Sequence, residues 1–333
     1  MSPSPTELKF KSVDGVDIFV DVYLPEKASK ENSAPVLLWW HGGGLLQGTR
    51  KGVAPHLVRA ASKHNLCVVS ADYRLAPQTR LPSILADCFD TIAFLRAPNS
   101  AFAQLVAGTA DATNKLIVSG SSAGGFLALL VGLGIGQTSV SSVLRDGVQV
   151  RRLDPPVKAI LPIYPITDLD DPFWTTKQRP VSYMPSIIPE ERVAPFLDSA
   201  AEKTAFSTLD SPRAVFYHYM VQEGILPALL LENTSISPST YSVAPAIRSR
   251  SCQLPIPPTY LIHGSIDDKV PPRQARDVFE ALKAYGSEEL GMSGQDLSQW
   301  VVYEEREGLD HLFDREEAEE MKDMYEFVKR VVG

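Results

Sequence analysis

The chain has 333 residues, 44% hydrophobic and 22% charged, a composition typical of a globular protein with a sizeable core in one large α/β domain or two ordinary ones. Its net charge of −8 argues against nucleic acid or an anionic membrane surface as a partner. Because no apolar run reaches the roughly 18 residues that a membrane span needs, we expect no span.

The first part of the chain predicts strands that alternate with helices. Asp14-Gly15 separates two runs of alternating polarity and predicts a hairpin over residues 7–24. Continuous apolar runs predict strands buried on both faces, and apolar residues at helical spacing predict helices. These segments are, in chain order, strand 36–40, helix 53–64, strand 66–70 and helix 83–96.

The same alternation returns near the C-terminus. The segments expected there are strand 157–164, strand 257–263, helix 273–285, strand 300–304 and a closing helix over 315–332. Strands that alternate with helices favour a mostly parallel sheet flanked by helices, which is an α/β fold. We expect one domain over residues 1–333.

One long segment interrupts this alternation of strands and helices. About 88 residues, 168–255, separate two core strands and are rich in proline and aromatic residues. A structureless loop of that length is implausible. We expect a mainly helical insertion that caps the mouth of the sheet, the alternative being a peripheral subdomain unrelated to the site.

A nucleophile motif lies between a strand and a helix in the middle of the chain. Gly120-Ser121-Ser122-Ala123-Gly124 fits the pattern G-x-S-x-G, with Ser122 at its centre. A serine on a sharp strand-to-helix turn sits in a strained backbone, and side chains two residues away would collide with the turn. The following helix start directs N–H groups toward developing negative charge. Ser122 is the predicted nucleophile.

The base and the acid should follow the serine in the order acid, then histidine. Three histidines lie downstream of Ser122. His311 follows the last strand, where a base can reach the strand ends, and is the predicted base. His218 lies in the insertion and His263 ends a buried strand, so we expect structural roles for both.

The acid candidates are adjacent. The segment His263-Gly-Ser-Ile-Asp-Asp-Lys-Val-Pro271 resembles the H-G-x-x-D-x-x-V-P loop that follows a core strand in many hydrolases, and the register of that resemblance selects Asp267. Asp268 falls one residue late, and we expect it to be solvated or paired with Lys269.

Consecutive glycines end an upstream strand in His41-Gly-Gly-Gly44. Glycines expose backbone N–H groups with no side chain in the way, as an oxyanion hole requires. Gly43 and Gly44, together with the N–H of Ala123, are the predicted donors. His41 is expected to hold the loop by hydrogen bonds.

Together these residues resemble the α/β-hydrolase superfamily, and within it the hormone-sensitive-lipase-like carboxylesterases (the α/β-hydrolase fold-3 group). The motifs that carry the resemblance are His41-Gly-Gly-Gly44, Asp72-Tyr-Arg-Leu-Ala-Pro77, Gly120-Ser-Ser-Ala-Gly-Gly125, Tyr164-Pro165 and Gly308-x-x-His311-x-Phe313. The resemblance implies Ser122 as nucleophile, His311 as base, Asp267 as acid, no cofactor and a cap over the pocket. It also implies that Asp72 and Arg74 are structural ties. Gln78 replaces a glutamate that the family carries after the D-Y-R-L-A-P run.

The function expected from these features is that of a serine carboxylesterase working through an acyl-enzyme. A specialised biosynthetic hydrolase, lactonase, thioesterase or acyltransferase for a larger polyketide-like compound is the runner-up, and a non-catalytic receptor of the same fold is a third reading. Neither H-E-x-x-H nor C-x-x-C occurs in the sequence, so we expect no metal site.

The expected partner is a small-molecule ester or acyl substrate, and homodimerisation stays open. The N-terminus lacks the basic start and apolar core of a signal peptide. Cys67, Cys88 and Cys252 are too scattered for a disulfide framework, so a cytoplasmic location is the simplest expectation.

Overall fold

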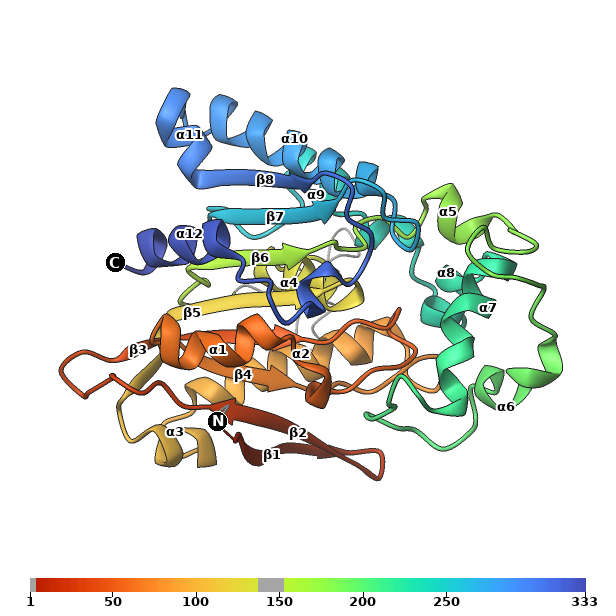
Figure 1. The fold of residues 1–333 in the computed structure, drawn as a ribbon, viewed down its shortest axis with the longest axis horizontal. Coiled ribbons are helices and arrows are strands. Elements are labelled where there is room, and N and C mark those ends of the chain that lie inside the picture. The colour runs from red at the N-terminus through yellow and green to blue at the C-terminus, as the bar shows by residue number, and fades with distance from the viewer. Residues whose placement is uncertain (1–3, 137–152) are drawn as a thin grey trace.

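An eight-stranded sheet runs through the part of the chain that the computed structural model describes, residues 4–136 and 153–333 (Figure 1). The strand order is β1-β2-β4-β3-β5-β6-β7-β8. β2 pairs antiparallel with β1 and with β4, and the remaining pairs are parallel. The strands are β1 (Thr6–Val13), β2 (Val16–Tyr23), β3 (Ala34–Trp40), β4 (Cys67–Ala71), β5 (Ala110–Ser121), β6 (Ala159–Ile163), β7 (Thr259–Gly264) and β8 (Val301–Arg306). The predicted α/β fold is confirmed.

The predicted hairpin is present as well. Asp14 and Gly15 both have positive φ values, 53° and 77°. A two-residue turn of that kind matches the twist of the strands that it joins. β1 and β2 therefore form the antiparallel edge of the sheet.

Helices cover both faces of the sheet (Figure 1). One face packs against α1 (Pro55–Lys63) and α12 (Lys322–Val332). The other packs against α2 (Leu81–Arg96), α4 (Ala123–Gly132) and α10 (Pro272–Glu288). Two short helices that the sequence did not predict, α3 (Ala101–Val106) and α11 (Gly294–Trp300), complete this part of the fold.

The continuous apolar run of β3 follows from this double cover. Successive side chains of a strand point to opposite faces of its sheet. Leu38 and Trp40 therefore belong to the core on the α4 side, whereas Leu37 and Trp39 belong to the core on the α1 side. A strand buried on both faces needs apolar residues at every position.

Short helices joined by loops make up the insertion between β6 and β7. They are α5 (Pro172–Thr175), η2 (Glu190–Arg192), α6 (Ala194–Leu197), η3 (Pro212–Ala214), α7 (Val215–Glu223), α8 (Leu226–Leu231), η4 (Pro238–Tyr241) and α9 (Val243–Arg248). In Figure 1, α5 to α8 lie beyond the carboxyl ends of the parallel strands. This is the end of an open α/β sheet where ligands bind.

A buried arginine joins the insertion to the core. Arg213 donates hydrogen bonds to the carbonyl oxygens of Leu46 (2.6 Å) and Ala76 (2.6 Å) and to Oε1 of Gln78 (2.8 Å). The amide nitrogen of Gln78 in turn donates to the carbonyl of Phe196 at 3.0 Å. A glutamate here would accept from Arg213 but would not donate. The contacts give a physical reason for an amide at this position.

The closing helix is shorter than predicted. The sequence suggested a helix over 315–332, but α12 begins at Lys322 after a 3₁₀ turn, η5 (Phe313–Arg315), and a loop. Met321 is fully buried with a left-handed φ of 50°, which ends any continuous helix before it. The acidic run before it would also place like charges at helical spacing. Packing of one methionine decides where the helix starts.

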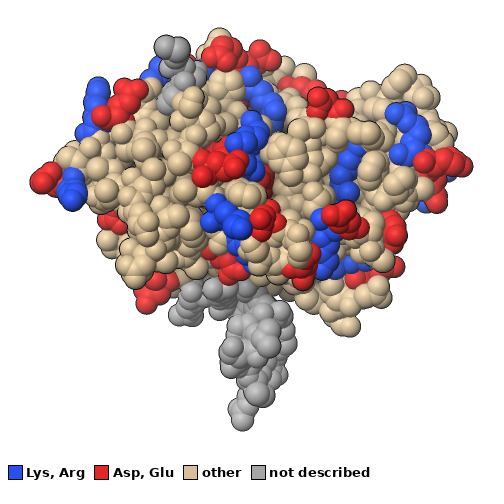
Figure 2. All heavy atoms as spheres, turned by 90° about the horizontal axis from the view of Figure 1, so that it is seen from below, with Lys and Arg blue, Asp and Glu red and all other residues tan. Residues whose placement is uncertain are grey.

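The outer surface carries both signs of charge. On the face in Figure 2, basic and acidic side chains lie beside one another rather than in separate patches. Lys9 and Asp17 of the edge hairpin form one such exposed pair at 3.3 Å. Among the described residues, no helix is both long and apolar enough to cross a membrane.

Candidate active site

Ser122 occupies a strained turn between β5 and α4. Its φ and ψ are 59° and −119°, values that a non-glycine residue rarely adopts. The turn is held by hydrogen bonds from the Ser122 N–H to the Ile163 carbonyl (2.8 Å) and from the Phe126 N–H to the Ser122 carbonyl (3.1 Å). Strain of this kind persists only where the surroundings over-determine it. The neighbouring strand β6 and helix α4 therefore fix the serine.

The glycines of the motif are required by close backbone contacts. A Cβ on Gly120 would lie 2.2 Å from the carbonyl carbon of Gly124. A Cβ on Gly124 would lie 1.9 Å from the carbonyl oxygen of Trp40 in β3. Both distances are far below van der Waals contact, and the obstacles are backbone atoms. Glycine at these two positions lets α4 start directly against β3 and β5.

His311 and Asp267 are in contact, although 44 positions separate them in the sequence. His311 lies in the loop after β8 and Asp267 in the loop after β7. Nδ1 of His311 is 2.7 Å from Oδ2 of Asp267. The other carboxylate oxygen of Asp267 accepts the backbone N–H groups of Lys269 and Val270, both at 2.9 Å. Asp268 instead pairs with Lys269, as expected from the sequence.

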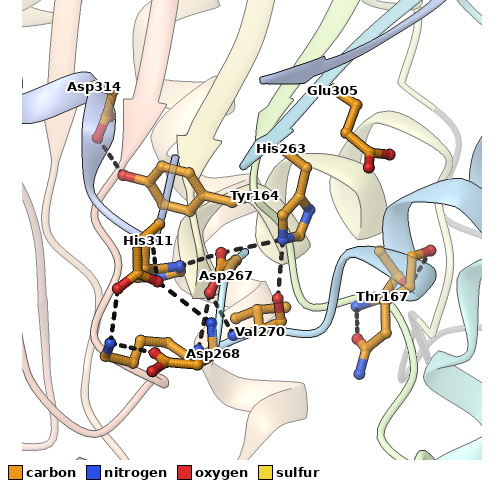
Figure 3. Close-up of polar contacts among 12 residues, drawn as sticks. Tyr164, Thr167, His263, Asp267, Asp268, Val270, Glu305, His311 and Asp314 are labelled. Carbon is orange, nitrogen blue, oxygen red and sulfur yellow. Dashed lines mark hydrogen bonds and ion pairs between the residues drawn. The ribbon is translucent and has the colours of Figure 1, made fainter. Parts of the chain in front are cut away.

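A second histidine holds Asp267 from the opposite side (Figure 3). Nε2 of His263 is 3.1 Å from Oδ2 of Asp267 and 2.9 Å from the Val270 carbonyl oxygen. Because a carbonyl only accepts, this nitrogen carries a proton. Burial alone would raise the pKa of Asp267, but the hydrogen bonds from His263 and His311 outweigh it and hold that pKa below its usual range. Asp267 is therefore an anion placed between two imidazoles.

A buried acid that binds Ser121, the neighbour of Ser122, was not predicted. Asp314 accepts hydrogen bonds from the hydroxyl groups of Tyr164 and Ser121, the latter at 2.9 Å, and the Tyr164 ring lies 4.3 Å from that of His311 (Figure 3). Burial raises the pKa of Asp314, against the opposing effect of the two hydroxyl donors. Asp314 follows His311 by three positions, but nothing in the sequence distinguishes it from the exposed acids after it. Only the fold reveals this contact.

Ser122 and His311 line one cavity of about 270 Å³. The insertion contributes further walls to this cavity through Tyr217 and His218 of α7 and Leu209 of the preceding loop. The insertion thus contributes to the cavity that Ser122 lines.

His218 was expected to have a structural role. It lines the same cavity as Ser122. Its Nδ1 atom is buried without a hydrogen-bond partner among the described residues. Burial, and after it the charge of Lys269, lowers the pKa of His218.

The loop formed by His41-Gly-Gly-Gly44, here called the glycine loop, approaches Ser122 closely. A Cβ on Gly42 would lie 3.1 Å from the Cβ of Ser122. Gly43 and Gly44 have positive φ values of 109° and 66°, and among the described residues neither N–H donates to an acceptor. Gly43 lines the cavity, whereas Gly44 and Ala123 are not among its lining residues. Ala123 is the first residue of α4, where an N–H has no partner within the helix.

The described residues hold no cluster of three or more histidines, cysteines, aspartates or glutamates that is arranged to bind a metal ion. All three cysteines are buried and unpaired. The cavity is lined by the Ser122 hydroxyl, by imidazole rings, by Gly43 and by the polar side chains of Gln47, Lys269 and Arg315.

Comparison with protein families agrees with the α/β fold described above. The BD-FAE family model matches residues 20–212, which is more than half of the chain and runs from the middle of β2 through β6 into the insertion. Among solved structures, an alpha/beta hydrolase superfamily protein from Enterococcus faecalis is 18% identical with a TM-score of 0.66, covering 98% of each chain. Esterase 2 of Thermogutta terrifontis, phosphoramylated by tabun, is 18% identical with a TM-score of 0.61, covering 99% of this chain and 94% of its own. At these identities the likeness shows the fold.

Curated relatives are much longer proteins. Non-reducing polyketide synthase pkbA of Emericella nidulans is 28% identical over 83% of this chain, and ausA of the same organism is 26% identical over 97%. The chain spans only 12% and 14% of these two relatives. It therefore matches one segment of each synthase.

Proposed function

The chain belongs to the BD-FAE family, a family of the α/β-hydrolase type, and on this premise we propose that it is a serine hydrolase that cleaves carboxylic esters through an acyl-enzyme. The observation that carries the proposal is the 2.7 Å contact of His311 with Asp267 at a cavity shared with Ser122. An imidazole oriented by a buried carboxylate beside a serine hydroxyl is the arrangement that nucleophilic acyl transfer requires.

In the proposed first step, the Ser122 hydroxyl attacks the carbonyl carbon of the ester while Nε2 of His311 takes its proton. Asp267 holds the proton on Nδ1, so Nε2 is left free to accept, and the carboxylate then stabilises the imidazolium. The imidazolium protonates the departing alcohol, and the serine keeps the acyl group. Water then attacks the acyl-enzyme, gives its proton to His311 and releases the acid as the Ser122 hydroxyl regains that proton.

The tetrahedral intermediate needs donors for its oxyanion. We assign this role to the N–H groups of Gly43, Gly44 and Ala123. Two of these belong to the glycine loop and have no acceptor among the described residues, and the third opens α4, whose N-terminal dipole favours negative charge. Donors fixed by the backbone need no reorganisation as charge develops, which is why such groups are effective.

A second candidate function is acyl release or transfer from a larger, polyketide-like compound, as a thioesterase, lactonase or acyltransferase. The relatives named above are polyketide synthases, and that likeness favours this candidate. The chemistry at Ser122 would be the same, with a thiol as leaving group or a metabolite hydroxyl in place of water.

The test is turnover of p-nitrophenyl esters from acetate to dodecanoate by the wild type and by Ser122→Ala. Ester hydrolysis predicts turnover that falls by several orders of magnitude in Ser122→Ala without a change in melting temperature. Labelling of Ser122 by a serine-directed phosphonate without turnover of any ester would favour the second candidate, to be assayed with acyl thioesters. Absence of both labelling and turnover would refute the hydrolase proposal and favour a receptor of the same fold.

A further inference from the structure

One side chain in the cavity is a buried amide without partners. Gln47 is only 6% exposed and lines the cavity that holds Ser122. Among the described residues its side chain makes no hydrogen bond, and its Oε1 atom is fully shielded from solvent. An unsatisfied buried polar group typically costs about 1–3 kcal/mol. Oε1 is an acceptor, so an anionic ligand would not relieve this cost. The NH₂ group is not among the fully shielded atoms, has no acceptor among the described residues and can donate to a ligand.

Arg315 lies at the same cavity. One Nη atom of its guanidinium donates to the carbonyl oxygen of Gly52 at 3.0 Å, and no described aspartate or glutamate forms an ion pair with it. The neighbouring acid, Asp314, is already bound to Tyr164 and Ser121. A guanidinium has five N–H donors in a planar fork, so most of the donors of Arg315 are available.

One loop carries Gln47 and anchors Arg315. Gln47 belongs to the loop that follows the glycine motif, and Gly52, which Arg315 binds, lies five positions further along that loop. The Gly52 N–H donates to the Thr49 carbonyl at 2.9 Å, and Thr49 also lines the cavity. The loop from Gln47 to Gly52 therefore brings a buried amide and an arginine to the same cavity.

The charge of the cavity is one-sided. No described aspartate or glutamate is among its lining residues. Its other permanent cation, Lys269, is occupied by the carboxylates of Asp268 and Asp310. Arg315 is thus the permanent cation in the described lining that forms no ion pair with a carboxylate, although its charge acts on the neighbouring buried Asp314. A cavity of this kind favours an anionic group.

We propose that Arg315 and Gln47 form a subsite that binds an anionic oxygen on the acyl part of the substrate, so that acidic acyl groups are preferred over apolar ones of equal size. The inference rests on the proposed function and deepens it. The arginine fork donates two parallel hydrogen bonds to a carboxylate-like group, and the Gln47 amide donates another.

The experiment compares two p-nitrophenyl esters of similar shape and opposite polarity, the monoester of glutarate and the ester of 5-methylhexanoate. A carboxylate stands in the first where an isopropyl group stands in the second. We expect kcat/KM of the wild type to be about tenfold higher for the glutarate ester than for the 5-methylhexanoate ester. A factor of about ten is what one hydrogen bond to a charged group typically contributes. Arg315→Gln should lower this ratio by about tenfold, Gln47→Leu by less, and Arg315→Lys should keep part of it.

The matched control is Arg330→Gln. Arg330 also binds a single backbone carbonyl, that of Gln299 at 2.9 Å, but it is exposed on α12 away from the cavity. Its substitution should leave the ratio at the wild-type value. A wild-type ratio near one, or a ratio equally preserved in Arg315→Gln and Arg330→Gln, would overturn the inference. If Arg315→Gln does not fold, the kcat/KM ratios of Arg315→Lys and Gln47→Leu for the two esters test the proposal instead.

Failure of the proposed function is a separate result. If neither ester is turned over, binding of the free acids is measured from the rise in melting temperature. A rise with glutarate that exceeds the rise with 5-methylhexanoate and disappears in Arg315→Gln would support the subsite. Equal rises with both acids would overturn it.

Discussion

The substitution Asp267→Asn tests the assignment of the acid most directly. The carboxylate accepts four contacts, from the backbone N–H groups of Lys269 and Val270 and from the rings of His263 and His311. An asparagine can keep the two backbone contacts through its carbonyl oxygen. Its NH₂ group would then face the two ring nitrogens.

The consequence differs between the two rings. His263 already donates to the Val270 carbonyl, so its Nε2–H would oppose the new NH₂ group. His311 would have to accept at Nδ1, which places its proton on Nε2, where the serine proton must go. In a serine-histidine-aspartate site this wrong tautomer costs about 10⁴ in kcat. We expect a loss of about 10³–10⁴ here.

The assay is kcat on the best p-nitrophenyl ester, with melting temperature measured in parallel. The matched control is Asp268→Asn, because that side chain pairs with Lys269 and does not contact His311. We expect Asp268→Asn to stay within about tenfold of the wild type, because the partly exposed ion pair of Asp268 with Lys269 contributes little and does not reach His311. Activity retained in Asp267→Asn but lost in Asp268→Asn would refute the reasoning.

Three further predictions concern stability. Gly124→Ala places a methyl group 1.9 Å from the Trp40 carbonyl oxygen, so we expect a loss of about 3 kcal/mol or more in urea unfolding, and an unchanged midpoint would contradict the steric argument. Tyr164→Phe removes one of the two hydroxyl donors of buried Asp314, and we expect a loss of about 1–3 kcal/mol, seen as a lower melting temperature. Burial lowers the pKa of His56 to about 3, so neutral His56 contributes stability that is complete above its unfolded pKa of 6.5 and is lost as pH falls toward 3. Between about pH 6.5 and 4.5 the free energy of unfolding of the wild type should therefore fall by about 2–3 kcal/mol more than that of His56→Gln. Parallel profiles of unfolding free energy against pH for the two proteins would disprove this linkage.

Local sequence patterns predict much of the fold. The Asp14-Gly15 turn and the apolar run of β3 predict their elements because a two-residue turn and a doubly covered strand each impose a residue type at every position. Helices α3 and α11 and the late start of α12 were missed. Short helices and helix starts depend on packing, such as that of Met321, more than on local preference.

The sequence by itself determined the serine turn, because Gly120 and Gly124 are needed wherever a helix begins this close to its strand. It also determined the order in which serine, acid and histidine follow one another. Tertiary structure decided which side chains meet. The sequence motifs had already selected Asp267 and His311 as acid and base, but the contact of buried Asp314 with Ser121 and the meeting of Gln47 and Arg315 at one cavity join segments that are distant in the chain. Such contacts form where the loops at the carboxyl ends of the parallel strands meet, and a local sequence pattern does not predict which side chains of different loops come together there.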